Sequence, residues 1–395
     1  MTARPRNQAR RPGERAADFG LDQWLVLSAL GLLAIGIVMV ASTSVAVGEK
    51  YAVGDWHFLL RHLVFVLMGL ALAGIAQGIR MAWLERVGHL FLLASLVLLG
   101  LVMVPGLGVT VNGATRWLNM GLFNFQVIEA VKLLMILYVA SYLARRPRLA
   151  ESGLLETLKP LLIGALVAAV VLRQPDMGSA VVLMAILGGM VWLAGAAWKS
   201  LTLMSLAALP LVTFAALEPY RLRRLTSFGD PFADPYDSGF QLVQALIAVG
   251  RGELAGVGIG GSVQKLFYLP EAHTDFIFAI LAEETGLVGI ALVLALFSVL
   301  VVRIFAVGLA AHRAGSCFAA YSVFGIALWL ALQALVSIGV NLGMLPTKGL
   351  PLPLMSAGGS SMLMLLLALG IVLRVARETG QAELSRPRRH REWEA

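Results

Sequence analysis

Long apolar runs are the feature that most constrains what this chain can fold into. Spanning the hydrocarbon of a bilayer as a helix takes roughly 20 predominantly apolar residues. Lipid offers no partner for exposed backbone groups, so such runs must be helical. We therefore predict an all-α, polytopic integral membrane protein, with one transmembrane domain over 23–376. Its expected transmembrane helices number about ten, near 23–44, 57–78, 86–104, 124–143, 157–173, 178–195, 199–217, 275–307, 317–341 and 357–376.

The composition supports this class. Apolar residues make up 59% of the 395 positions and charged residues 14%, against roughly 45–50% and 25% in soluble domains. The first apolar run follows an Arg-rich stretch, as in a signal peptide, but it exceeds the usual core of about 7–15 residues. We interpret it as a retained first span.

The distribution of basic residues predicts the orientation. With ten spans, both termini lie on one side, and that side holds twenty of the 31 Lys and Arg residues. The positive-inside rule then makes the Arg-rich tails 1–22 and 377–395 cytoplasmic, and one large loop of about 218–272 extracytoplasmic. The net charge of +8 is interpreted as topology and attraction to anionic membrane lipids. No nucleic-acid motif accompanies it, so nucleic acid is not an expected partner.

Cysteine and histidine predict little chemistry. Cys317 is the only cysteine, which excludes an intrachain disulfide and a cysteine metal site. The six histidines show no metal-ligand spacing.

Three long outer loops are candidates for function, because long loops in a compact fold are usually functional or disordered. They are 105–123, 218–272 and 343–361, and all are rich in apolar and aromatic residues. Within the second, 239–250 is too short to span and suits a re-entrant or interfacial segment. The glycines of 252–261 lack a strand–helix context for nucleotide binding and are interpreted as tight turns.

Several ionisable residues lie where a membrane helix should be apolar, which suggests function. Asp275 stands at the mouth of the run 275–307, where a carboxylate is ordinarily just a helix cap. Glu129 and Lys132 are three residues apart, so they share one helix face and can pair. Glu283 and Glu284 follow Asp275 by about two turns and suit a polar seam between helices.

If the outer loops converge, one cavity would gather a carboxylate and many cations. An enzyme acting on a lipid-linked phosphate needs cations for the pyrophosphate and a base for the attacking hydroxyl. A transporter of an anionic lipid needs the cations only, and a passive scaffold needs neither. The residues alone leave the enzyme and the transporter close to level. The residues expected there are Asp275, Glu129, Arg116, Lys132, Arg173, Asp176, Arg221, Arg223, Arg224 and Lys348.

Several long motifs, in order, resemble the SEDS family of cell-shape and division proteins, and within it the FtsW branch more than the RodA branch. The resemblance covers roughly 22–377 and includes the stretch from Ser262 to Phe278 that ends His-Thr-Asp-Phe-Ile-Phe. Its other segments are Asn112–Trp117, Arg173–Ser179, Pro231–Gln244, Asn341–Pro353 and Ser356–Ser361.

The resemblance implies a peptidoglycan glycosyltransferase of the bacterial inner membrane that polymerises lipid II at the division septum and releases undecaprenyl pyrophosphate. It implies work with a class B penicillin-binding transpeptidase (FtsI-like) and other divisome membrane proteins similar to FtsQ, FtsL, FtsB and FtsN. Asp275 would be the general base, and a divalent cation (Mg²⁺ or Mn²⁺) could assist at the pyrophosphate. A lipid II flippase is the alternative. The motifs add further candidate substrate-binding residues, namely Gln241, Gln244, Lys265, His273, Ser356 and Ser360.

The chain departs from the family pattern at three places. Val127-Ile128 stands where Pro-Ser is usual, Gly261 where asparagine is common, and Ala357 where tyrosine is common. None of these changes removes a group that is charged at neutral pH.

Overall fold

The computed structural model describes most of the chain between Asp22 and Ser385. The described residues are 22–50, 54, 56–111, 113–121, 123–146, 154–199, 202, 206, 228–237, 239–266, 268–347 and 349–385.

Within those residues, seven helices are long and apolar enough to cross a membrane. They are α1 (Gln23–Lys50), α2 (His57–Gly78), α5 (Val127–Ala144), α6 (Leu154–Arg173), α11 (Ile277–Arg313), α12 (Cys317–Asn341) and α13 (Gly359–Ser385). Shorter helices accompany them: α3 (Met81–Arg86), α4 (Gly88–Val102), α7 (Met177–Leu193) and α10 (Phe240–Arg251).

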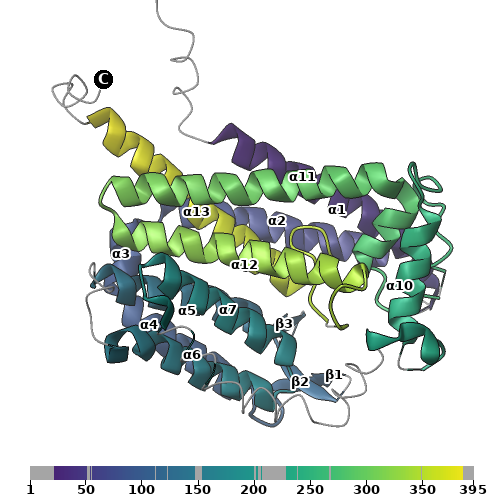
Figure 1. Ribbon diagram of the computed structural model, residues 1–395, viewed down its shortest axis with the longest axis horizontal. Coiled ribbons are helices and arrows are strands. Elements are labelled where there is room, and N and C mark those ends of the chain that lie inside the picture. The colour runs from purple at the N-terminus through teal and green to yellow at the C-terminus, as the bar shows by residue number, and fades with distance from the viewer. Residues whose placement is uncertain are drawn as a thin grey trace, which may run out of the picture.

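The helices form an elongated bundle whose two ends differ (Figure 1). The start of α1 and the end of α13 lie at one end, which we call the terminal end. Helix α10 and a small sheet lie at the opposite end, the loop end. Helix α13 packs against α2, α11 lies between α1 and α12, and α5 packs against α4 and α12.

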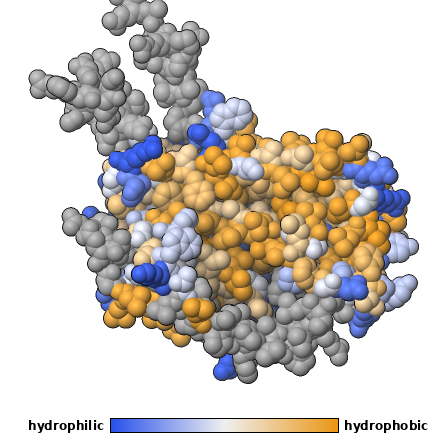
Figure 2. Space-filling view, in the orientation of Figure 1, coloured by the Kyte–Doolittle hydropathy of each residue, from blue (hydrophilic) through white to orange (hydrophobic). Residues whose placement is uncertain are grey.

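The outer surface of the bundle is apolar. Leucine, valine and tryptophan side chains such as Leu67, Val288 and Val302 are more than half exposed. Figure 2 shows this apolar surface across the middle of the bundle, with hydrophilic residues gathered toward its ends. Such a belt needs lipid around it, because soluble proteins rarely expose apolar patches above a few hundred Å².

The prediction of an all-α polytopic membrane protein is confirmed for the body of the protein. Nine of the predicted spans correspond to helices, with starts that differ by up to three residues and ends that differ by up to nine. The tenth, 199–217, lies almost wholly outside the described residues. The segment 239–250 was predicted to be re-entrant or interfacial, and it is the short helix α10 at the loop end.

The first outer loop contains a sheet that the sequence did not predict. Strands β1 (Gly108–Val111), β2 (Ala114–Asn119) and β3 (Asn124–Gln126) form an antiparallel sheet in the order β1-β2-β3. Trp117 in β2 pairs with Val109 on one side and Gln126 on the other. Because β3 runs directly into α5, the sheet fixes how that helix begins at the loop end.

Helix α11 is interrupted at Gly286, which has φ 63° and ψ −159°. The glycine-rich segment 252–258 lies against the interruption and bonds to its free backbone groups. Val257 N donates to Glu283 O at 3.0 Å, and Leu287 N donates to Glu253 O at 3.0 Å. An unsatisfied backbone group is costly in a membrane, so this loop makes the break possible.

Glycine is required at position 286 for two reasons. Its positive φ is a conformation that other residues adopt only under strain. A Cβ there would also stand 2.5 Å from Gly256 N and 2.6 Å from Leu254 O. Gly74, on the exposed face of α2, has nothing within 4 Å of such a Cβ.

We expect Gly286→Ala to lower the free energy of unfolding by roughly 1–3 kcal/mol, the usual cost of a strained backbone residue. Gly74→Ala, the matched control, should leave stability unchanged or raise it by up to about 1 kcal/mol. The thermal unfolding midpoint of each purified variant in detergent gives the comparison. Equal midpoints for the two variants would show that the break at Gly286 is not needed.

Candidate functional site

Asp275 lies at the loop end, two residues before α11 begins, and is half-buried. It does not cap the helix. The capping side chain is Asn341, at the end of α12, whose Oδ1 accepts from Ala279 N at 3.0 Å. Asn341 Nδ2 donates to the Asp275 carbonyl oxygen at 3.0 Å. The backbone of Asp275 is therefore fixed by a neighbouring helix, and capping does not require its carboxylate.

The loop between α12 and α13, residues 342–358, wraps the same segment. Ser356 Oγ donates to the Thr274 carbonyl oxygen at 2.7 Å and accepts from Leu352 N at 2.7 Å. Ala357 N donates to the His273 carbonyl oxygen at 3.1 Å. A Cβ on Gly349 would stand 3.0 Å from Asp275 Oδ2, so this glycine lets the loop backbone approach the carboxylate. Two predicted site residues, His273 and Ser356, are thus brought next to Asp275.

Glu129 and Lys132 pair on α5, as their spacing predicted. Lys132 Nζ lies 2.8 Å from Glu129 Oε1, and both side chains are fully buried. The ammonium also donates to Gln333 Oε1 at 2.7 Å and lies 4.9 Å from the ring centre of Trp329. Gln333 Nε2 in turn donates to the Pro351 carbonyl oxygen at 3.0 Å. A hydrogen-bonded chain therefore runs from α5 through α12 to the loop beside Asp275.

Arg116 and Asp176 meet at the turn between α6 and α7. Arg116 donates to the carbonyl oxygens of Gln174 and Pro175, at 3.1 and 2.5 Å, and lies 3.9 Å from Asp176. Asp176 caps α7 by accepting from Ser179 N at 3.1 Å. Arg116 thereby joins β2 to the α6–α7 turn, and 28% of its side chain remains exposed.

Ser360 joins the sheet to the last helix. Its Oγ accepts from Gln126 N at 2.9 Å, which connects the end of β3 to the start of α13. Nearby, the ring of Phe58 on α2 lies 5.2 Å from that of His273. Residues of α2, the end of α12 and the 342–358 loop therefore contact the segment 273–275.

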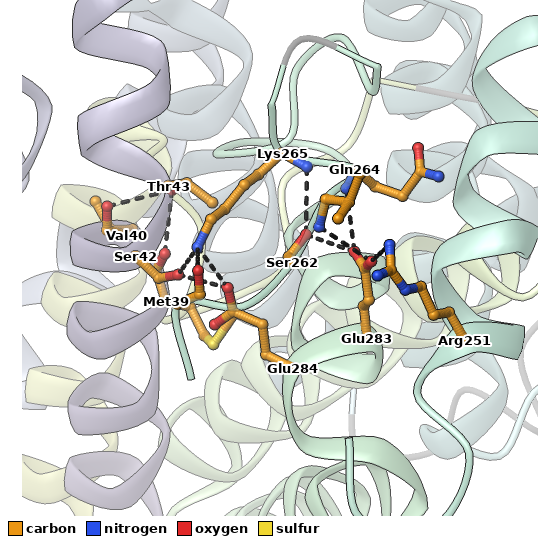
Figure 3. A network of polar contacts seen from close by, with 12 residues as sticks. Met39, Val40, Ser42, Thr43, Arg251, Ser262, Gln264, Lys265, Glu283 and Glu284 are labelled. Atoms are coloured by element: carbon orange, nitrogen blue, oxygen red, sulfur yellow. Dashed lines mark hydrogen bonds and ion pairs between the residues drawn. The ribbon is translucent and has the colours of Figure 1, made fainter. Parts of the chain in front are cut away.

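The remaining candidates are placed differently. Gln241 and Gln244 are half-buried on α10, and Arg173 is exposed at the end of α6. Lys265 is buried next to Glu284, with Glu283 close by, so the expected polar seam exists (Figure 3). Four predicted cations lie outside the described residues, namely Arg221, Arg223, Arg224 and Lys348.

Two residues that organise the site were not predicted to do so. Gln333 and Asn341 are fully buried polar side chains on α12. Both interrupt the apolar run 317–341, and a polar residue inside a span is itself a signal of a partner on another helix. The signal was present in the sequence, but it does not identify the partner.

A metal ion would find few protein ligands here. Over the described part of the chain, no group of three or more His, Cys, Asp or Glu side chains is placed to hold one.

Comparison with known proteins matches the chain to one family over nearly the whole of its length. The family model for FtsW, RodA and SpoVE, described as cell cycle proteins, matches residues 23–381. The chain belongs to the FtsW/RodA/SpoVE family. The resemblance to SEDS proteins inferred from the motifs is thereby confirmed.

Relatives named FtsW match this protein over most of its length. A protein of Thioalkalivibrio sulfidiphilus, named probable peptidoglycan glycosyltransferase FtsW, is 52% identical over 91% of this chain and 90% of its own length. One of Coxiella burnetii with the same name is 47% identical over 92% and 98%.

Solved structures of the family share the fold. A chain from a peptidoglycan synthase complex is 32% identical, with a TM-score of 0.75 over 91% of this chain and 99% of that one. The rod shape determining protein RodA of Thermus thermophilus is 30% identical, with a TM-score of 0.67 over 91% and 98%.

The buried series of hydrogen bonds from Lys132 through Gln333 to Pro351 provides a stability prediction for this protein. We expect Gln333→Leu to lower the free energy of unfolding by roughly 3 kcal/mol, because it removes a partner from Lys132 and from the Trp329 indole in a dry interior. Gln77→Leu, at a half-buried glutamine near the terminal end, is the control and should change stability by less than about 0.5 kcal/mol. Thermal unfolding of both variants measures this. An unfolding midpoint for Gln333→Leu equal to that of the control would mean that these buried hydrogen bonds contribute nothing to stability.

Proposed function

We propose that this protein is a peptidoglycan glycosyltransferase that polymerises lipid II into glycan strands and releases undecaprenyl pyrophosphate. The names of its relatives support the reaction class. The observation that carries the proposal is the placement of Asp275. Its backbone is held by Asn341, its neighbour Thr274 by Ser356, and its carboxylate is not used to cap α11.

Asp275 would act as general base on the acceptor sugar. Its carboxylate removes the proton from the attacking hydroxyl as that oxygen bonds to the anomeric carbon of the donor. The bond from that carbon to the pyrophosphate oxygen breaks, and its electrons leave with the pyrophosphate. A sugar hydroxyl is a poor nucleophile, so a positioned base contributes roughly 10²–10⁴-fold.

Cations would stabilise the charge that develops on the leaving pyrophosphate. Arg116 is the best placed of the described candidates, because part of its side chain is exposed. Arg173 is exposed as well. Lys132 is fully enclosed by Glu129, Gln333 and Trp329, so direct contact with a ligand would require this core to open. Arg221, Arg223, Arg224 and Lys348 complete the proposed set.

The distribution of buried charge favours an enzyme over a lipid II flippase. A flippase needs polar groups continuously across the membrane. In the described part of the chain, the Asp22–Arg303 pair at the terminal end is partly exposed, and the charged residues that are buried as a whole all belong to the loop-end half of the bundle. They are Glu129, Lys132, Asp176, Lys265, Glu283 and Glu284.

The structural match to a peptidoglycan synthase complex supports a partner in the membrane. We infer that a class B penicillin-binding transpeptidase works with this chain at the division septum, alongside other divisome membrane proteins. The terminal end would face the cytoplasm and the loop end the outside, in agreement with the positive-inside rule.

The test is polymerisation of purified lipid II by the full-length protein with its transpeptidase partner. Asp275→Asn keeps the shape of the side chain but removes the base, so the rate should fall by about 10²–10⁴-fold. Asp237→Asn, at an exposed aspartate of the large outer loop, is the matched control and should retain the wild-type rate.

Near-normal polymer yield from a folded Asp275→Asn variant would refute the base assignment. Vesicles with lipid II in one leaflet test the alternative: transfer to the other leaflet by the wild-type protein, with no polymer formed, would favour the flippase.

A further inference from the structure

A second buried polar cluster lies where α11 is interrupted, apart from the Glu129–Lys132 pair. Figure 3 shows Lys265 and Ser262 from the outer loop facing Glu283 and Glu284 on α11, with Ser42 approaching from α1. Glu283, Glu284 and Lys265 are all buried. The reaction proposed above uses none of these groups as a base.

Glu283 holds the start of the loop segment that leads to Asp275. Its carboxylate accepts from Ser262 Oγ at 2.5 Å, from Val263 N at 3.1 Å and from Gln264 N at 3.3 Å. Arg251 on α10 lies 3.5 Å away and is partly exposed. Residues 262–265 are thus bound to α11 through backbone and side chain together.

Glu284 has a narrower set of partners. Its Oε1 lies 2.8 Å from Lys265 Nζ and accepts from Ser42 Oγ at 2.6 Å. Lys265 also donates to Ser42 Oγ at 2.8 Å and to the Gly260 carbonyl oxygen at 2.7 Å. Within the described residues, Oε2 is buried with no hydrogen-bond partner. Among the described residues, Lys265 is the only cation that pairs with this carboxylate.

The chain segment between this cluster and the start of α11 is held at both ends. Residues 262–265 are bound to Glu283 and Glu284 of α11. The chain then continues mostly as turns and enters α11 at Ile277. Hydrogen bonds from Leu269 N to Gln264 O, at 2.9 Å, and from Phe276 N to Glu271 O, at 3.2 Å, connect successive turns. Fixing Lys265 at one end therefore limits where Asp275 can stand at the other.

We propose that Lys265 is a positioning residue: its buried ion pair with Glu284, completed by Ser42, locks the segment 262–276 against α11 and α1 and so fixes the place of Asp275. This role replaces the substrate contact that the motif suggested for Lys265. It rests on the proposed function only in naming Asp275 as the group that is positioned.

The proposal has a consequence that ligand binding does not share. Removing one member of a buried ion pair leaves an uncompensated charge, whereas removing both can be nearly neutral. Neutralising Glu284 should therefore rescue the loss of Lys265. If Lys265 instead bound pyrophosphate, neutralising Glu284 could not restore the missing cation.

The experiment compares Lys265→Met, Glu284→Gln and the double variant in the full-length protein. Lys159→Met is the matched control, because Lys159 pairs with Glu156 in an exposed setting on α6, where an ion pair contributes little. Two readouts are used: hydrogen exchange of the backbone amides of 262–276 in detergent, and KM and kcat for lipid II polymerisation.

We expect Lys265→Met to speed exchange in 262–276 and to lower kcat, each by at least about tenfold, with KM nearly unchanged. The double variant should recover both to within about threefold of wild type, and Lys159→Met should match wild type. If Lys265→Met fails to fold, the double variant should fold and remain protected.

The proposal would be overturned if the double variant exchanged its 262–276 amides as fast, and polymerised as slowly, as Lys265→Met. It would also be overturned if Lys265→Met raised KM and left hydrogen exchange unchanged. Hydrogen exchange requires no activity. A wild-type protein that forms no polymer therefore refutes the proposed function, while the exchange comparison still decides whether the lock exists.

Discussion

The absence of water inside a bilayer is the constraint on which the rest of this structure depends. Every polar group that enters the apolar body must find its partner within the protein, because hydrocarbon offers none. The protein meets this condition by pairing its buried charges internally, and two groups of them lie in the loop-end half of the bundle. One is centred on Lys132 between α5 and α12, and the other on Lys265 between α1, α11 and the outer loop.

The two clusters support the Asp275 segment from different sides. Through Gln333 and Pro351, the first reaches the 342–358 loop, whose Gly349 lies beside the carboxylate. Through residues 262–276, the second reaches Asp275 along the backbone. Helix α12 contributes to both the support and the helix start, since Gln333 and Asn341 lie two turns apart on it. The outer loop that carries Asp275 is thereby given a fixed geometry by the helices it packs against.

Much of this could be predicted from the sequence, and the reason is hydropathy. The apolar runs predicted the helix starts to within three residues and the helix ends to within nine, because burial in lipid is the strongest determinant of a membrane fold. The spacing of Glu129 and Lys132 predicted their pairing, since residues three apart share a helix face. Asp275 was expected near a helix start, and it lies there.

What escaped prediction depends on contacts between distant residues. The sheet of β1, β2 and β3 has no apolar alternation strong enough to stand out in a loop that contains apolar residues throughout. The interruption at Gly286 rests on one glycine among many, and only its contact with Leu254 and Gly256 distinguishes it. Asn341, not Asp275, caps α11 because the end of α12 comes next to Ala279, which the chain order does not reveal.

Helices α1 and α11 are joined at two heights. At the terminal end Arg303 Nε donates to Asp22 Oδ2 at 2.8 Å, and toward the loop end Ser42 donates to Glu284 at 2.6 Å. These two contacts are about 30 Å apart along α1, at 1.5 Å per residue. That distance is about the thickness of the hydrocarbon layer of a bilayer. The two contacts therefore hold α1 and α11 in register across the membrane, and a shift of either helix along its axis would have to break both.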